Sequence, residues 1–184
     1  MAISERLYTA EEFFDYAAKP ENDAKRLELD DGVIVEMSPS SPTNTVIAGR
    51  LIYFFNAFVI PNDLGFVTSP DGGFKLASSR VRQPDVGFIS KARLPRLPKS
   101  FTMPPDLAVE VVSEDEDIFL KAREYLHSGV RMVWAVYADD RVVYVMTLNE
   151  QGGILSLPFG VNDTLDGGDV LPGFALPVRD IFPT

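Results

Sequence analysis

Two acidic residues stand inside runs of strand-forming side chains. Asp85 follows a proline and precedes the run at 86–89, and Glu110 lies within the apolar run at 106–112. An ionised carboxylate in such a run is costly unless it has a partner, and two carboxylates carried into one sheet commonly share a divalent cation. These residues predict a metal-dependent hydrolase that acts on phosphodiester bonds.

The expected metal site needs few protein ligands. Magnesium binds few carboxylates together with waters and phosphate oxygens, so Asp85, Glu110 and the backbone carbonyl of Val111 form a sufficient set. We expect Mg²⁺, with Mn²⁺ as an alternative, to polarise the phosphoryl group and to lower the pKa of a bound water. Side chains alternate between the two faces of a sheet. The two carboxylates can therefore share a cation if Asp85 lies on a neighbouring strand and points to the same face as Glu110.

Two further charged residues are candidates for the same site. Lys121 lies in the first half of the helix expected at 115–128, from where its ammonium can reach back over the sheet and stabilise charge in the transition state. Glu28 precedes the turn Asp30-Asp31-Gly32 and is a candidate outer metal ligand or water-orienting group. The predicted catalytic set is Asp85, Glu110, Lys121 and Glu28.

Each candidate also has a structural alternative. Asp85 can cap a turn at the start of a strand, where proline is common. Glu110 can form a buried ion pair with Arg82 or Lys121. Lys121 can be a solvated surface residue, and Glu28 can belong to the polar end of a hairpin.

The elements that hold these residues follow helix and strand patterns. The segment 9–12 is a capping-box pattern that opens a short helix ended by Pro20, and Thr43 or Asn44 is expected to cap a second helix with one apolar face. This order predicts an α/β fold, with a mixed central sheet flanked by helices, in a single domain at 1–184. Strands are expected at 26–29, 33–37, 66–69, 73–76, 86–89, 106–112, 131–137 and 141–148, a third helix at 115–128, and a surface loop at 91–105.

The composition is that of a soluble globular protein. The chain has 184 residues, of which 46% are hydrophobic and 24% charged. The absence of cysteine removes disulfides, thiolate metal sites and cysteine nucleophiles, and fits a cytoplasmic location. No segment is apolar enough for a signal peptide or a membrane span, so no membrane partner is expected.

The net charge of −10 is unfavourable for binding nucleic acid, because phosphates are repelled on average. A local basic patch can exist within an acidic average, and the middle of the chain is rich in basic residues. The alternative is that these side chains only decorate an exposed strand end and loop. The residues are Lys75, Arg80, Arg82, Lys91, Arg93, Arg96 and Lys99.

Several short segments form an ordered pattern around the two acids. They are Leu27-Glu28-Leu29-Asp30-Asp31-Gly32, Met37-Ser38-Pro39, Gly65, Arg82-Gln83-Pro84-Asp85-Val86, Pro105-Asp106-Leu107, Glu110-Val111-Val112-Ser113, and Lys121 with Tyr125, Gly129-Val130 and Trp134. This set resembles the PD-(D/E)xK nuclease superfamily, in particular a bacterial family of uncharacterised restriction-endonuclease-like proteins, over nearly the whole chain. The resemblance implies a restriction-endonuclease-like fold and a Mg²⁺-dependent endodeoxyribonuclease acting on DNA.

The resemblance also implies a role for each site residue. It makes Asp85 and Glu110 metal ligands and Glu28 the supporting acid. The lysine of the superfamily normally lies two residues after the second acid, a position that Val112 holds in this sequence. The resemblance implies that Lys121, on the following helix, takes its place.

A second hypothesis is that the fold serves as a binding or assembly module with lost or attenuated catalysis. The acidic net charge favours it, as do Val112 at the lysine position and Glu114 where a proline usually follows Ser113. The family histidine near the start of the second helix is also replaced, by Thr43-Asn44. A third hypothesis, a glycosidase using the same carboxylates, requires aromatic side chains in an open cleft, whereas Trp134 is expected to be buried.

Apolar residues of the second helix extend beyond one narrow stripe, which indicates an interface. We therefore expect a homodimer, in which two sites can cut both strands of a duplex. The residues are Phe54, Phe55, Phe58, Val59 and Ile60.

Overall fold

The structure is a computed structural model that describes residues 6–113 and 117–183. Its helices are α1 (Ala10–Ala17), α2 (Pro42–Val59) and α3 (Ile118–His127), with short 3₁₀ helices η1 (Pro20–Asn22) and η2 (Val178–Asp180). Its strands are β1 (Leu27–Asp30), β2 (Val33–Glu36), β3 (Gly65–Thr68), β4 (Phe74–Ala77), β5 (Arg80–Arg82), β6 (Val86–Ser90), β7 (Leu107–Val111), β8 (Met132–Tyr137), β9 (Val142–Leu148), β10 (Ile154–Phe159), β11 (Thr164–Gly167) and β12 (Leu171–Pro177). No helix in the described part of the chain has the length and hydropathy needed to cross a membrane.

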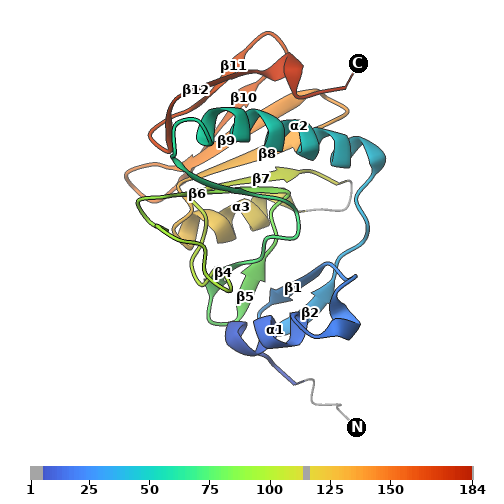
Figure 1. Ribbon diagram of the computed structural model, residues 1–184. Coiled ribbons are helices and arrows are strands. Elements are labelled where there is room, and N and C mark those ends of the chain that lie inside the picture. Colours follow the sequence, from blue (N-terminus) through green and yellow to red (C-terminus); the bar gives the residue numbers. More distant parts are fainter. Residues whose placement is uncertain (1–5, 114–116, 184) are drawn as a thin grey trace.

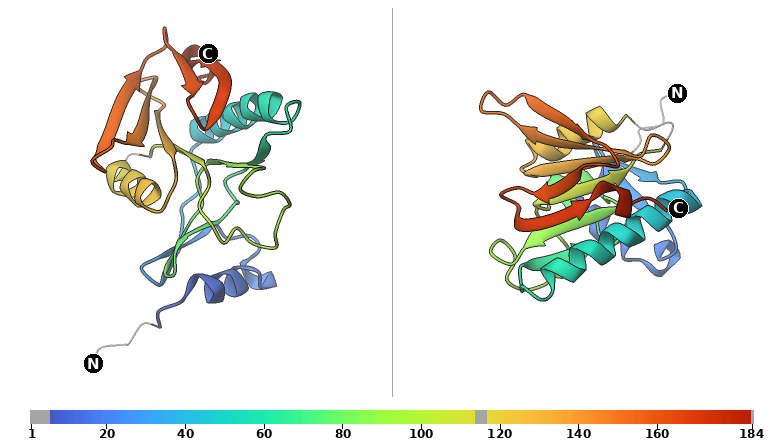
Figure 2. Two further views of the ribbon diagram at one scale, coloured as in Figure 1. Left: turned by 90° about the vertical axis from the view of Figure 1, so that its left-hand side faces the viewer. Right: turned by 90° about the horizontal axis from the view of Figure 1, so that it is seen from above.

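The larger of the two main sheets has six strands in the order β10-β9-β8-β7-β6-β3. Only β7 and β8 run parallel, because α3 connects them as a crossover, so the sheet is mixed as predicted. Helix α2 and the β11–β12 ribbon pack on one face and α3 on the other (Figures 1 and 2). Strand β7 is buried throughout, which confirms the prediction of a central strand covered on both faces.

The smaller sheet has four strands in the order β2-β1-β5-β4 and packs against α1 near the N-terminal end of the molecule (Figure 1). The hairpin turn expected after β1 is present, with Asp31 at φ 45° and Gly32 at φ 86°. This left-handed backbone explains the Asp-Gly sequence of the turn. Strand β5 was not predicted, since a strand of three residues with two arginines carries almost no apolar pattern.

The N-caps observed in the structure agree with the prediction for one helix and differ from it for another. The capping box of α1 is confirmed, with Thr9 as its N-cap. The cap predicted for α2 at Thr43 or Asn44 is wrong: Ser41 is the N-cap and its hydroxyl accepts from the Asn44 backbone N–H at 3.1 Å. Pro42 then occupies the first helical position, where its missing N–H costs nothing. Helix α3 begins after its N-cap Asp117, and the start expected at residue 115 lies outside the described residues.

Most of the apolar residues predicted to form an interface on α2 are instead covered by the chain itself. The Phe55 ring stacks on Phe174 of β12, with centroids 4.9 Å apart, and Phe58 meets the same ring edge-on. Val59 is fully buried, whereas Ile60 is 68% exposed. The sequence misled here because the ribbon that covers α2 comes from the C-terminal tail, far away along the chain.

Antiparallel pairing of β6 and β7 separates two regions that are close in sequence. Asp85 precedes β6 and Val111 ends β7, so both lie at one edge of the sheet. The loop at 91–105 connects the opposite ends of these strands, roughly 14 Å away at the usual rise per residue. The basic loop is therefore not adjacent to the candidate acids.

Phe55→Ala tests the aromatic cluster that joins α2 to the sheet and the ribbon. Phe55 is fully buried between Trp134 and Phe174, so its removal should lower the free energy of unfolding by about 3–5 kcal/mol. Urea unfolding measures this loss. Leu97→Ala, at a 62% exposed side chain in the 91–105 loop, is the control and should change stability by less than about 0.5 kcal/mol. Equal losses in the two variants would contradict this packing.

Candidate functional site

Strand register brings the two predicted acids to facing positions. Val86 of β6 pairs with Val109 of β7, so the next position outward sets Asp85 opposite Glu110. Side chains alternate along β7: Val109 packs towards α2, whereas Ala108 packs towards α3. Glu110 therefore points to the α3 face, as the sequence predicted.

Asp85 is held by one backbone group and one arginine. The Val111 N–H donates to Asp85 Oδ2 at 2.8 Å, and Arg26 Nη2 donates to Asp85 Oδ1 at 3.1 Å. The side chain of Asp85 is 10% exposed. Its carboxylate thus ties the start of β6 to the end of β7, a structural role other than the turn cap that was the alternative.

Glu110 is held by two residues of α3 that lie one helical turn apart. The Tyr125 hydroxyl donates to Glu110 Oε1 at 2.6 Å, and Lys121 Nζ lies 3.1 Å from Glu110 Oε2. The spacing of four residues puts Lys121 and Tyr125 on the same face of the helix. The buried ion pair that was one alternative for Glu110 is present, with Lys121 as the partner.

Lys121 also links Glu110 to the smaller sheet. Its Nζ lies 3.9 Å from Glu28 Oε1, and its side chain is only 10% exposed, so the alternative of a solvated lysine is wrong. The two glutamates belong to different sheets, β7 in the larger and β1 in the smaller. The structure therefore brings Glu28, Glu110 and Lys121 together where the two sheets meet.

Glu28 is fixed by the segment that leads to Asp85. The Gln83 N–H donates to Glu28 Oε1 at 2.9 Å, and Arg82 Nη1 donates to Glu28 Oε2 at 3.1 Å. Arg82 also contacts Glu124 at 2.6 Å and Asp30 at 2.8 Å. Burial acts to lower the pKa of Arg82, but the surrounding carboxylates, Glu28 first, raise it above its ordinary value.

Tyr125 stays neutral in this environment. Burial raises the pKa of Tyr125 well above its ordinary value, and the negative charges of Glu110 and Glu28 raise it further. Its hydroxyl therefore remains a donor to Glu110 throughout the physiological range.

The residues present fit a divalent cation with few protein ligands. Asp85 and Glu110 offer carboxylate oxygens from facing positions, and the Val111 carbonyl already accepts from Asn44 Nδ2 at 3.2 Å with a second lone pair left. Such hard oxygen ligands suit Mg²⁺ or Mn²⁺ completed by waters. Among the described residues, no group of three or more His, Cys, Asp or Glu side chains is placed to hold a metal.

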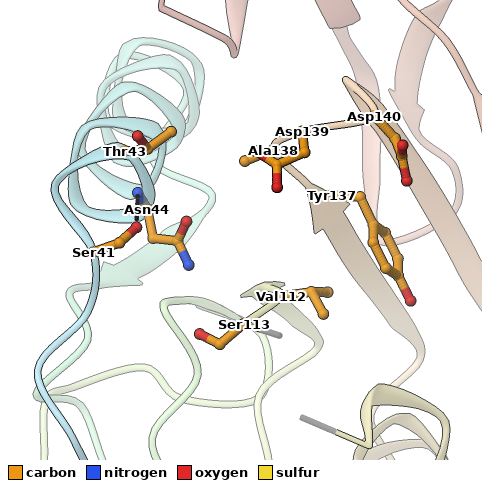
Figure 3. Close-up of a pocket in the computed structure, with 9 residues that line it drawn as sticks. All are labelled: Ser41, Thr43, Asn44, Val112, Ser113, Tyr137, Ala138, Asp139 and Asp140. Carbon is orange, nitrogen blue, oxygen red and sulfur yellow. Dashed lines mark hydrogen bonds between the residues drawn. The ribbon is translucent and has the colours of Figure 1, made fainter. Parts of the chain in front are cut away.

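Two surface pockets border this region. One, of about 250 Å³, is lined by Glu28, Lys121 and Arg82. The other, of about 420 Å³, lies between the start of α2 and the β8–β9 turn, with Asn44 and Ser113 at its wall (Figure 3). Glu28 and Lys121 are therefore reachable from the surface through the first pocket, whereas Asp85 and Glu110 line neither pocket.

The basic cluster predicted as a nucleic-acid patch is dispersed over the molecule. Lys75 pairs with Glu11 and Lys91 pairs with Asp63. Arg93 lies 3.1 Å from the fully buried Asp106, at the end of β7 remote from Glu110. These three side chains neutralise local acids away from the site, whereas Arg80 and Arg82 pair with the acids around Glu28. Trp134 is fully buried, as predicted, and supplies no sugar-stacking surface.

Sequence reasoning assigned no site role to Arg26, Tyr125 or Asn44. The spacing from Lys121 to Tyr125 could have found Tyr125. Arg26 carries no such signal, because its partner Asp85 is 59 positions away. The contact of Asn44 with Val111 depends on how α2 packs on β7, which the sequence does not reveal.

Tyr125→Phe tests the hydroxyl contact with Glu110. A tyrosine whose native pKa is raised stabilises the fold fully below the unfolded pKa of about 10, and this stabilisation is lost as the pH rises above that value. In metal-free urea unfolding, the wild type should exceed the variant by about 1–2 kcal/mol near neutral pH, and the difference should shrink above about pH 10. Tyr53→Phe on the surface is the control. A wild-type advantage that stays constant above this pH would contradict the assignment.

Comparison with known proteins agrees with this architecture. The family model Uma2, described as "Putative restriction endonuclease", matches residues 10–179. A crystal structure described as "a putative nuclease belonging to DUF820" from Anabaena variabilis ATCC 29413 has a TM-score of 0.73 and 18% sequence identity, covering 85% of this chain and 89% of that one. This likeness confirms the predicted restriction-endonuclease-like α/β fold. The search of curated proteins found no match. Because the family model spans most of the chain, the protein belongs to the Uma2 family of putative restriction endonucleases.

Proposed function

We propose that this protein is a Mg²⁺-dependent endodeoxyribonuclease, with Mn²⁺ as an alternative cation. One observation carries the proposal: Lys121 Nζ lies 3.1 Å from Glu110 and 3.9 Å from Glu28, and the β6–β7 register sets Asp85 opposite Glu110. A buried lysine and several carboxylates at one surface-accessible point suit phosphodiester hydrolysis better than a purely structural ion pair. The match to the Uma2 family supports the same reading.

Each residue has a separate task in this proposal. Asp85, Glu110 and the Val111 carbonyl hold the cation, which when bound polarises the phosphate and lowers the pKa of a bound water. Lys121 stabilises the negative charge that develops on the phosphate. Because its side chain is buried and paired with Glu110, the ammonium is in position before the substrate binds. Glu28 orients the attacking water from the opposite sheet.

Asp85→Asn and Glu110→Gln test the metal site. Each removes one anionic ligand while preserving size, so Mg²⁺ binding measured by calorimetry should weaken by at least about tenfold, and cleavage of plasmid DNA should be lost. Asp63→Asn is the matched control, since it removes the same charge from a largely exposed acid that pairs with Lys91. Unchanged Mg²⁺ affinity in both site variants, with intact folding, would refute this metal site.

Lys121→Met separates catalysis from metal binding. The variant keeps a long side chain but loses the charge, so kcat for DNA cleavage should fall by about 10²–10³-fold. Mg²⁺ binding by the same variant should persist, because Lys121 is not a metal ligand in this proposal. Wild-type cleavage by Lys121→Met would show that the lysine is only structural.

The second candidate function is a nuclease-fold binding or assembly module. The observation that favours it is that each acid already has a cation: Arg26 for Asp85, Lys121 for Glu110 and Arg82 for Glu28. A site neutralised in this way is stable without metal. No DNA cleavage by a folded protein at millimolar Mg²⁺ would support this function over the nuclease.

A homodimer is part of the nuclease proposal, because two sites are needed to cut both strands of a duplex in one encounter. The outward face of α2 offers apolar side chains for it, with Val46 46%, Tyr53 66% and Ile60 68% exposed. Analytical ultracentrifugation at micromolar concentration should give twice the monomer mass. A monomer at that concentration would remove the dimer from the proposal.

A further inference from the structure

Arg26 joins three segments at the edge of the candidate site. Its Nη2 donates to Asp85 Oδ1 at 3.1 Å and to the Gln83 carbonyl at 3.0 Å, and its Nη1 donates to Ser40 Oγ at 3.2 Å. Within residues 6–113 and 117–183, its buried Nε has no hydrogen-bond partner. The guanidinium is therefore held beside Asp85 with part of its donor capacity unused.

Arg26 differs from the other two cations of the site. Its side chain is 20% exposed, against 11% for Arg82 and 10% for Lys121. Arg82 contacts three acids, whereas Asp85 is the one acid that pairs with Arg26 among the residues that the structure describes. Of the three, Arg26 is the cation that can leave its acid at the lowest cost.

The two oxygens of Asp85 also differ. Oδ2 accepts from the Val111 backbone N–H at 2.8 Å, a contact fixed by the pairing of β6 and β7. Oδ1 has the Arg26 side chain as its partner. A cation arriving at Asp85 therefore meets Arg26 at the oxygen that the backbone leaves free.

We propose that Arg26 is an internal competitor for the metal ligand Asp85, and that it becomes a phosphate contact once a divalent cation displaces it. This inference rests on the proposed nuclease site. In the metal-free protein the guanidinium neutralises Asp85. When a divalent cation takes Oδ1, like charges repel and Arg26 Nη2 gives up its hydrogen bond to Asp85 while it keeps the one to the Gln83 carbonyl.

The released guanidinium suits a phosphate oxygen of the DNA backbone. A guanidinium presents a planar fork of N–H donors that can pair with two phosphate oxygens. In Arg26 this fork consists of Nε, which is unused, and Nη2, which is released from Asp85. Ser40 and the Gln83 carbonyl keep the side chain near the site during this exchange. Metal binding and substrate binding are thereby coupled through one residue.

Arg26→Gln tests the competition directly. In the wild type, Mg²⁺ must first break the charged hydrogen bond between Arg26 and Asp85, whereas the variant has no such bond to break. Calorimetry should therefore show that Mg²⁺ binds the variant about tenfold more tightly. Arg80→Gln is the matched control: its side chain is 21% exposed, it removes the same charge, and Arg80 contacts Asp30, Asp31 and Glu124 but not Asp85. The control should bind Mg²⁺ within about twofold of the wild type.

If Arg26→Gln lowers the stability of the fold, thermal unfolding gives a second measurement of the competition. The variant leaves Asp85 without its cation, so its Tm should fall without metal and should rise more on adding Mg²⁺ than the wild-type Tm does. Mg²⁺ affinity and a Mg²⁺-induced Tm rise equal to those of the wild type would overturn the inference while leaving the metal site intact. No Mg²⁺ binding by either protein would overturn the proposed function as well.

The phosphate contact is tested in a Lys121→Met background, in which cleavage of the DNA is slow on the timescale of a binding measurement. Fluorescence anisotropy of a labelled duplex, with and without Mg²⁺, measures how much the cation increases DNA affinity. Adding Arg26→Gln should remove about tenfold of that increase, whereas adding Arg80→Gln should not. The same Mg²⁺-dependent increase with and without Arg26 would overturn the exchange of Arg26 from Asp85 to phosphate.

Discussion

A glutamate buried in the central strand of the larger sheet is the constraint on which this structure depends. Glu110 cannot keep its charge in β7 without partners, and Lys121 with Tyr125 supplies both a cation and a hydroxyl donor. Because these partners come from α3, the helix is fixed in position and in rotation over the sheet. The helix that connects the parallel strands β7 and β8 thus also positions Lys121 and Tyr125 at the site.

The same electrostatic network joins the two sheets. Glu28 of β1 reaches Lys121, and Arg82 of β5 connects Glu28 with Glu124 of α3. Because burying these charged groups is costly, each of them must keep its partners. The candidate site lies at this junction, so its geometry depends on both sheets keeping their relative placement. An acidic protein can therefore carry a cluster of buried cations, although its net charge is −10.

Predictions from the sequence held best where a local rule applies. The capping box at Thr9, the Asp-Gly hairpin turn and the central strand around Glu110 all follow from short-range patterns and are present. They failed where two rules competed: Thr43 or Asn44 was expected to cap α2, yet Ser41 is also a good cap and Pro42 fits the first position of a helix. The cover of Phe55 and Phe58 by the C-terminal ribbon has no local signature at all.

The sequence alone determined the fold class, the pair Asp85 and Glu110, and the candidates Lys121 and Glu28, since alternation along strands and an acid in an apolar run are readable without coordinates. Tertiary structure decided which cation meets which acid. Arg26 and Asp85 lie 59 positions apart, and their contact exists only because β1 and the start of β6 meet at the junction of the sheets. Long charged side chains can reach many partners, so only the packed backbone selects among them.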